Sequence, residues 1–525
     1  MTTLDWLVLA VYAVLMLALS AWLGGRQRDE ADYYVGGRRL PWWATGLSTL
    51  ATQTSAVSVI SVPAFVALAP GGGLVWLTYE LALPLAMIGV AVLLLPFFRS
   101  LELVTVYEYL ERRYGPSLRL ATSAVFLVSR GLAAGVALYA AALVVATVLG
   151  MPLAAAIVGM GLFTLCYDVL GGIRAVIWSD VIQMAVLAAG VLLAGAIATD
   201  AVGGVGTLLE VTDPARLAVF RGADDTPSPM PFWSFFAGGL FLYLAYYGTD
   251  QSQAQRELAS AGVVQTRRSL ALNGFARFPL TLMYAGLGLA LGAVAATQPD
   301  FAARIPADRP DALFPAFVRE FLPPGARGIV IAALLAAAMS SLDSAFNSLS
   351  AATLRDFVER RRPLGPEASL RYGRLTTVLW GVVATTFAFA VPAMEGTVIE
   401  SINRIGSAFY GPVLAVFVVG VVTARGDERG ALIGLAAGVA VNLALWGFVP
   451  QLFWMWWNPI GFAVTALTAL MVSGRVAPPG AREATLAGSG FAARWGGWRP
   501  VYTWLVVYWV VILAALWAVS ALSGV

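Results

Sequence analysis

Long apolar segments recur along the whole chain and are separated by short polar stretches. The hydrocarbon core of a bilayer is spanned by roughly 20 apolar residues in a helix. On that criterion the pattern predicts about 14 spans, at 4–23, 42–66, 74–98, 118–148, 152–170, 175–198, 231–254, 270–297, 327–354, 373–391, 399–423, 430–447, 456–474 and 500–523. The chain is therefore predicted to be an all-α integral membrane protein.

Composition agrees with this class and excludes several functions. Of the 525 residues, 59% are hydrophobic and 12% are charged, and the mean hydropathy is +0.79. The chain has no histidine and a single cysteine, Cys166, so a histidine triad, a thiolate metal cluster and a disulfide framework are excluded. No phosphate-binding glycine loop precedes a helix. We therefore expect no enzyme, no organic cofactor, no nucleic-acid partner and no obligate protein partner.

The arginines predict the orientation. Every basic residue is an arginine, and an N-terminus outside the cell places 24 of the 33 arginines in cytoplasmic loops and six in the opposite loops. Among the cytoplasmic ones are Arg26, Arg28 and the run 360–362. By the positive-inside rule, both termini are expected to be extracytoplasmic in a multi-pass protein of the cell membrane.

Two predicted spans are interrupted by polar and small residues. The second span contains the polar stretch 48–58 followed by Pro63, and the seventh contains 246–251, which reads Tyr-Tyr-Gly-Thr-Asp-Gln. Irregular backbone at membrane depth is tolerated where it lines a cavity or is buried in protein. Broken helices five spans apart are typical of a five-plus-five inverted repeat. We expect a ten-helix transport core at 42–423, a peripheral first helix and loop at 1–41, and three peripheral helices at 424–525.

The ninth span carries the densest polar face. Helical spacing places Ala337, Ser340, Ser341, Ser344 and Asn347 on one side. Hydroxyl and carbonyl oxygens on such a face suit a sodium ion, whereas small residues alone equally suit close helix packing. The neighbouring acidic residue at 343 favours a cation, because a buried carboxylate is costly without a partner.

Isolated charges raise a second question. Arg130 lies near the middle of the fourth span, and a mid-membrane arginine faces either a substrate or a structural partner. The structural alternative is an ion pair with Glu80, Asp180 or Asp343. Arg277 and Glu80 pose the same question, and Asp180 is alternatively a helix-start carboxylate at the favourable dipole end.

Four segments carry a resemblance to a known family: Tyr33–Arg38, Gly171–Asp180, Gly248–Gln251 with Gln255-Arg256, and Ser340–Asn347. With these the chain resembles the sodium:solute symporter family across nearly its whole length. The resemblance implies the LeuT-type fold. It also implies sodium-coupled import of a small polar organic solute, with anions among the candidates, by alternating access.

Carried over residue by residue, the family's principal sodium site falls on the carbonyls of Ala51, Thr54 and Ala337 and the hydroxyls of Ser340 and Ser341. Some members bind a further sodium. Its site would fall on Asp180, Ser340, Asp343 and Ser344. Asp343 stands where the compared symporters have a hydroxyl residue, so this second site could be stronger, altered or proton-linked. One or two sodium ions are therefore expected.

The resemblance also suggests substrate contacts. Similarity to the galactose branch points to Ser58, Glu80, Leu83, Tyr243, Arg277 and Asn403, with Tyr246 at the inner aromatic gate. The hydrophobic Leu83 and the aromatic Tyr243 replace polar sugar contacts. The stretch 51–56, which contains Gln53 and Ser55, resembles the sialic acid and monocarboxylate branches instead. In the sialic acid branch an arginine matching Arg130 binds the substrate carboxylate.

Three alternatives stay open at this point. A proton-coupled carrier could use Asp343 or Asp180, a membrane sensor could bind the solute without transport, and a passive channel could conduct it. The broken helices and buried carboxylates favour a gated carrier.

Overall fold

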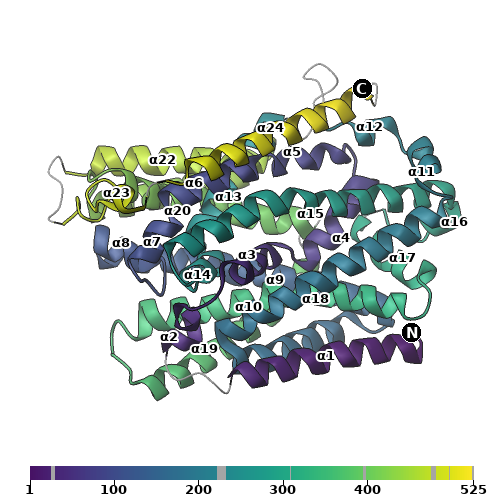
Figure 1. Ribbon diagram of the computed structural model, residues 1–525, viewed down its shortest axis with the longest axis horizontal. Coiled ribbons are helices and arrows are strands. Elements are labelled where there is room, and N and C mark those ends of the chain that lie inside the picture. Colours follow the sequence, from purple (N-terminus) through teal and green to yellow (C-terminus); the bar gives the residue numbers. More distant parts are fainter. Residues whose placement is uncertain are drawn as a thin grey trace.

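The computed structural model describes residues 1–24, 30–220, 232–307, 309–393, 398–474, 480–495 and 497–522, and every regular element in those ranges is helical. Long helices run side by side along the longest axis of the molecule (Figure 1). They are α1 (Thr3–Gly24), α9 (Pro116–Leu149), α10 (Leu153–Ala201), α13 (Phe232–Thr249), α15 (Val263–Thr297), α18 (Ala326–Ala352), α19 (Pro366–Ala388), α20 (Val398–Val422), α21 (Glu428–Phe448), α22 (Trp457–Val472) and α24 (Arg499–Leu522). The shorter helices are α2 (Glu30–Val35), α3 (Trp42–Gln53), α4 (Ala56–Leu68), α5 (Leu77–Glu80), α6 (Ala82–Leu93), α7 (Leu95–Ser100), α8 (Tyr107–Arg113), α11 (Val205–Val211), α12 (Pro214–Leu217), α14 (Gln251–Leu258), α16 (Pro299–Ala302), α17 (Leu313–Phe321) and α23 (Phe491–Trp495).

The predicted spans correspond to helices, although fourteen is an approximate count. Ten helices within the described ranges are long and apolar enough to cross a bilayer, and α3 with α4 forms an eleventh, bent span. The predicted spans 152–170, 231–254 and 373–391 fall on the first part of α10, on α13 and on α19. None of these three helical segments is both long enough and apolar enough to be counted among the ten. The predicted span limits at 231 and 523, and Arg26 and Arg28, lie outside the described residues.

Both predicted helix interruptions are present. The axes of α3 and α4 differ by 55° across Thr54 and Ser55. Between α13 and α14, Asp250 has extended backbone (φ −79°, ψ 121°), and its carboxylate accepts a hydrogen bond from the Ser252 N–H at 2.8 Å. A third break lies inside α10 at Gly172, whose φ of 56° and ψ of −174° favour a glycine.

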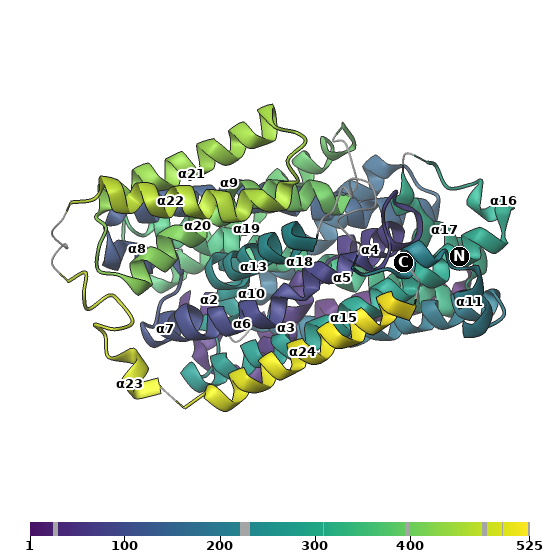
Figure 2. The same ribbon diagram turned by 90° about the horizontal axis from the view of Figure 1, so that it is seen from above.

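Burial separates the centre of the bundle from its periphery. In their most apolar windows, 83% of the α18 residues are buried inside the protein, against 22% in α1 and α24. Viewed from above, α24 lies along one edge of the bundle and the paired helices α21 and α22 lie along the opposite edge (Figure 2). The start of α1 and the end of α24 lie at the same end of the bundle (Figures 1 and 2). The side of the membrane that this end faces stays a prediction.

Candidate transport site

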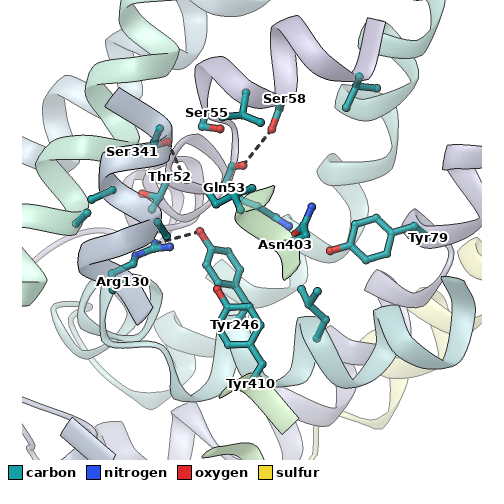
Figure 3. Close-up of a pocket in the computed structure, with 18 of the residues that line it drawn as sticks. Thr52, Gln53, Ser55, Ser58, Tyr79, Arg130, Tyr246, Ser341, Asn403 and Tyr410 are labelled. Carbon is teal, nitrogen blue, oxygen red and sulfur yellow. Dashed lines mark hydrogen bonds between the residues drawn. The ribbon is translucent and has the colours of Figure 1, made fainter. Parts of the chain in front are cut away.

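A cavity of about 110 Å³ lies at the break between α3 and α4. It is also lined by residues from α5, α9, α13, α15, α18 and α20, so helices distant in sequence border one space. Its side chains combine hydroxyls, amides, three charged groups and aromatic rings (Figure 3). The lining residues are Thr52, Gln53, Ser55, Val57, Ser58, Val62, Trp76, Tyr79, Glu80, Arg130, Ala133, Ala134, Ala137, Leu242, Tyr246, Arg277, Ser341, Ala345, Ile402, Asn403 and Tyr410.

Next to the cavity, the hydroxyls of α18 meet the carbonyl end of α3. Ser340 Oγ donates to the carbonyl oxygens of Ala337 at 3.1 Å and Ala51 at 3.3 Å. Ser341 Oγ donates to the Thr52 carbonyl oxygen at 3.0 Å and to Ala337 at 3.4 Å. The break at Thr54 ends α3, so its last carbonyls are not all used within the helix. Hydroxyl and carbonyl oxygens thus gather at one point, and oxygen ligands are those that hard cations prefer.

The predicted second cation site contains an arginine. Arg256 Nε donates to Ser48 Oγ at 2.7 Å, and its Nη2 lies 3.3 Å from Asp180 Oδ2 and donates to Ser344 Oγ. This guanidinium therefore bridges α14 to α3, α10 and α18. Asp343 is linked to it through Ser344: its two oxygens accept hydrogen bonds from Tyr167 and Ser344, each at 3.1 Å.

Arg130 has a carboxylate partner that the sequence did not identify. Its Nε lies 3.9 Å from Asp250 Oδ1, which is within ion-pair range but too long for a hydrogen bond. Nη2 donates to Tyr246 Oη at 3.2 Å and to Ser252 Oγ, which itself donates to Asp250 at 2.5 Å. The guanidinium also lies over the Tyr246 ring, 5.3 Å from its centroid. The structural alternative named Glu80, Asp180 or Asp343 as the ion-pair partner of Arg130; those partners are wrong, because Asp250, the N-cap of α14, is the carboxylate that Arg130 reaches.

Glu80 and Asp180 are paired with other arginines. Arg277 reaches the Glu80 carboxylate at 3.3 Å and 3.4 Å and donates to Thr54 Oγ1 at 3.0 Å. Both members of this pair are buried and line the cavity. A buried charge that loses its partner is strongly destabilising, so the Arg277–Glu80 pair carries a structural role whatever else it contacts.

Aromatic rings border the cavity on two sides. Tyr246 and Tyr410 lie near Arg130, with ring centroids 6.0 Å apart, and Tyr79 lies across the cavity (Figure 3). Tyr243 was a predicted substrate contact, but it does not line the cavity. Its ring is fully buried and stacks at 4.6 Å against Tyr79, which does line it. The cavity surface that the sequence assigned to Tyr243 therefore belongs to Tyr79.

The other predicted substrate residues lie together. Gln53, Ser55, Ser58, Glu80, Arg130, Tyr246, Arg277 and Asn403 all line the cavity, whereas Leu83 is buried outside it. Gln53 is held from both ends: Tyr247 donates to its side-chain oxygen, and Ser58 Oγ donates to its carbonyl at 3.5 Å. Asp250 and Arg256 belong to quoted motifs, yet their partners stayed unassigned. Thr52, Tyr79 and Tyr410 were not predicted, since nothing local distinguishes them from core residues.

A membrane bundle with broken helices around a buried polar cavity, next to a cluster of hydroxyl and carbonyl oxygens, defines a secondary active transporter. A sequence profile of the sodium:solute symporter family matches residues 33–438, and the chain belongs to that family. The prediction of sodium-coupled solute transport is confirmed by this membership, and the chain is a transporter rather than an enzyme.

Individual relatives support the same assignment. The chain is 30% identical to the human sodium/iodide cotransporter, with 84% of this chain and 69% of the relative aligned. It is also 30% identical to the human sodium-coupled monocarboxylate transporter 1, over 84% and 72% of the two chains. The solved structure of a Na⁺-coupled sialic acid symporter, in a substrate-bound outward-open state, superposes with a TM-score of 0.80 at 24% identity. That superposition covers 90% of this chain and 100% of the other, and it confirms the predicted LeuT-type fold.

Proposed function

We propose that this symporter imports a small organic anion, of the size of a short monocarboxylate, and that Arg130 binds its carboxylate. The observation that carries the proposal is the hydrogen bonding of Arg130. Among the described residues its Nη1 forms no hydrogen bond, although the side chain lines the cavity. A guanidinium with an unused donor is a ready partner for a carboxylate, and charge-assisted hydrogen bonds are the stronger ones.

The charges around the cavity make this assignment specific. Glu80 is already paired, because Nε and Nη2 of Arg277 both donate hydrogen bonds to its carboxylate. Asp250 offsets the charge of Arg130 through a 3.9 Å contact that leaves room for a second, better-placed carboxylate. Ser252 links Arg130 to Asp250, because its hydroxyl accepts a hydrogen bond from Arg130 and donates one to Asp250. A substrate that binds Arg130 therefore also alters the Ser252–Asp250 contact at the α13–α14 break.

The cavity volume favours a small substrate. An engineered protein cavity of about 150 Å³ holds benzene, which has six heavy atoms. A cavity of about 110 Å³ then holds roughly four to six heavy atoms. The relatives named for iodide, monocarboxylates and sialic acid all take anions. A nine-carbon sugar acid would require the cavity to widen, whereas a short monocarboxylate fits it as it stands.

Sodium binds, in this proposal, where α3 meets α18. Its ligands are the carbonyls of Ala51, Thr54 and Ala337 with the hydroxyls of Ser340 and Ser341. Two hydrogen bonds support this set, because Ser340 already reaches the Ala51 and Ala337 carbonyls. Thr52 is an additional candidate through its carbonyl, which Ser341 contacts. A sodium ion here would contact the carbonyl oxygens that now accept hydrogen bonds from the two serine hydroxyls.

One sodium per substrate follows from the position of Arg256. The second candidate site, Asp180, Ser340, Asp343 and Ser344, already has a cation beside Asp180 and Ser344. A second sodium would have to displace that guanidinium from Ser48, Asp180 and Ser344. Arg256 therefore acts as the resident cation. The ten-helix core at 42–423 and the extracytoplasmic termini complete the proposal.

Uptake into proteoliposomes tests the function. The substrates are labelled acetate, propionate, pyruvate and lactate, with galactose, sialic acid and the amides propionamide and lactamide as comparisons. We expect sodium-gradient-driven uptake of one or more short monocarboxylates that stops when choline replaces sodium. Full uptake without sodium under an imposed pH gradient would identify a proton-coupled carrier. Saturable binding with no accumulation under any gradient would identify a sensor.

A further inference from the structure

A second cavity lies on the surface of the bundle, away from the transport site. It is a groove of about 440 Å³ between α10 and α19. Its floor is apolar, formed by Val169 of α10 with Leu370, Leu375 and Val378 of α19. Two arginines of α19, Arg371 and Arg374, line the same groove.

These two arginines place unpaired positive charge in the groove. They are exposed and three positions apart, so their side chains lie on one face of α19. Among the described residues neither forms an ion pair or a hydrogen bond, whereas Arg355 and Arg360 on the preceding segment pair with Glu108, Glu359 and Glu111. Glu367 also lines the groove, which leaves a net charge of one positive unit.

The apolar surface continues from the groove along α19. Leu375 and Leu379 are each 55% exposed, and Val382 is 54% exposed. In a membrane protein such a surface faces the acyl chains of lipid. The groove therefore presents an apolar channel that ends at two unpaired guanidinium groups near the start of the helix. An acidic phospholipid matches this arrangement, because its negatively charged phosphate can lie on the guanidinium groups while its acyl chains lie on the apolar surface.

We propose that this groove binds an acidic phospholipid, with its phosphate on Arg371 and Arg374 and an acyl chain over Val169 and Val378. Basic pockets between transmembrane helices bind the headgroups of acidic lipids, and the planar arginine fork matches phosphate geometry. The leaflet follows from the predicted orientation, in which α19 begins at the cytoplasmic side. Val169 lies three residues before the backbone break at Gly172, so the bound lipid contacts α10 next to a point where that helix changes direction.

Native mass spectrometry of the delipidated full-length protein tests the proposal, with phosphatidylglycerol and phosphatidylcholine as the probes. For wild type we expect saturable phosphatidylglycerol binding and weak phosphatidylcholine binding. The double variant Arg371→Gln/Arg374→Gln should lower phosphatidylglycerol affinity by about tenfold or more, the loss expected for a charge-assisted contact. Glu367→Gln should raise it, because it removes the one opposing charge in the groove.

Two further variants separate the groove from general surface charge. Arg361→Gln/Arg362→Gln removes the same number of exposed positive charges outside the groove and should leave phosphatidylglycerol affinity unchanged. Val378→Trp keeps both arginines but fills the groove, and it should weaken binding. An equal loss in the Arg361/Arg362 control, or unchanged binding in both groove variants, overturns the proposal. These readouts do not depend on the transported substrate, so a failure here leaves the proposed transport function unaffected.

Discussion

Ser341 Oγ donates a hydrogen bond to the carbonyl oxygen of Thr52 at 3.0 Å, and both residues line the substrate cavity. The same hydroxyl belongs to the sodium site proposed between α3 and α18. The proposed sodium ligands and the proposed substrate cavity therefore share one side chain. Because binding linkage is reciprocal, a substrate that tightens sodium binding must itself be bound more tightly when sodium is present, by the same factor.

The first prediction concerns that shared hydroxyl. Ser341→Ala should raise the sodium concentration for half-maximal uptake by roughly tenfold or more, since hydrogen bonds or ligands to charged groups contribute about 1.5–3 kcal/mol. It should also weaken substrate binding at subsaturating sodium. Ser348→Ala on the same helix is the control, because within the described part of the chain its buried hydroxyl bonds only to the Ala345 carbonyl, at 2.9 Å. Unchanged sodium dependence in Ser341→Ala, measured as uptake against sodium concentration, contradicts the assignment.

A second prediction addresses the Arg277–Glu80 pair. Arg277→Gln or Glu80→Gln alone leaves a buried charge uncompensated and should destabilise the protein by about 3–5 kcal/mol. The double variant removes both charges and should recover much of the thermal stability of the purified protein. If each single variant keeps the wild-type melting temperature but loses uptake, the pair serves the substrate rather than the fold.

The interruptions of the helices were predictable because their causes are local. Polar residues and Pro63 in the second span, and Gly248 to Gln251 in the seventh, disfavour a continuous lipid-facing helix wherever they lie in the fold. The serine face of α18 was predictable for the same reason, since helical spacing alone aligns its hydroxyls. The all-α membrane class followed from length and hydrophobicity, whereas the LeuT-type fold rested on the helix interruptions and the family resemblance.

The ion pairs were not predictable in this way. Arg130 and Asp250 are 120 positions apart, as their numbers show, and several buried carboxylates were available to each arginine. Choosing among them requires knowing that the Arg130 side chain on α9 reaches Tyr246 and Ser252 at the α13–α14 break, which no local pattern contains. Tyr243 shows the same limit. It lies on a predicted span, but the ring of Tyr79 stacks on it and lines the cavity in its place.

The third prediction concerns sodium stoichiometry. With Arg256 beside Asp180 and Ser344, uptake should depend on sodium with a Hill coefficient of about one, since the coefficient cannot exceed the number of coupled sites. Asp343→Asn should leave both this coefficient and the charge moved per substrate unchanged. A coefficient near two in wild type that falls in Asp343→Asn would instead assign a second sodium to Asp343.

The last prediction concerns the substrate contact of Arg130. Arg130→Lys should lower the affinity for a carboxylate substrate by roughly ten- to 150-fold, because lysine loses the planar fork and about 1.5–3 kcal/mol of charge-assisted hydrogen bonding. The measurement compares binding of a monocarboxylate and its neutral amide to wild type and variant. Wild type should prefer the carboxylate, and Arg130→Lys should lose most of that preference while amide binding changes little.

The structural alternative gives a different pattern, and Asp250 provides the control. If Arg130 only offsets Asp250, then Arg130→Gln should reduce expression and thermal stability, and Arg130→Gln/Asp250→Asn should restore both together with uptake. If Arg130 binds the substrate carboxylate, the double variant regains stability but still fails to distinguish carboxylate from amide. Asp250→Asn alone then sharpens the test, because it removes the competing carboxylate 3.9 Å from Arg130 and should tighten binding of the anionic substrate. Weaker anion binding in Asp250→Asn, with the fold intact, would show that Asp250 positions Arg130 for the substrate and does not compete with it.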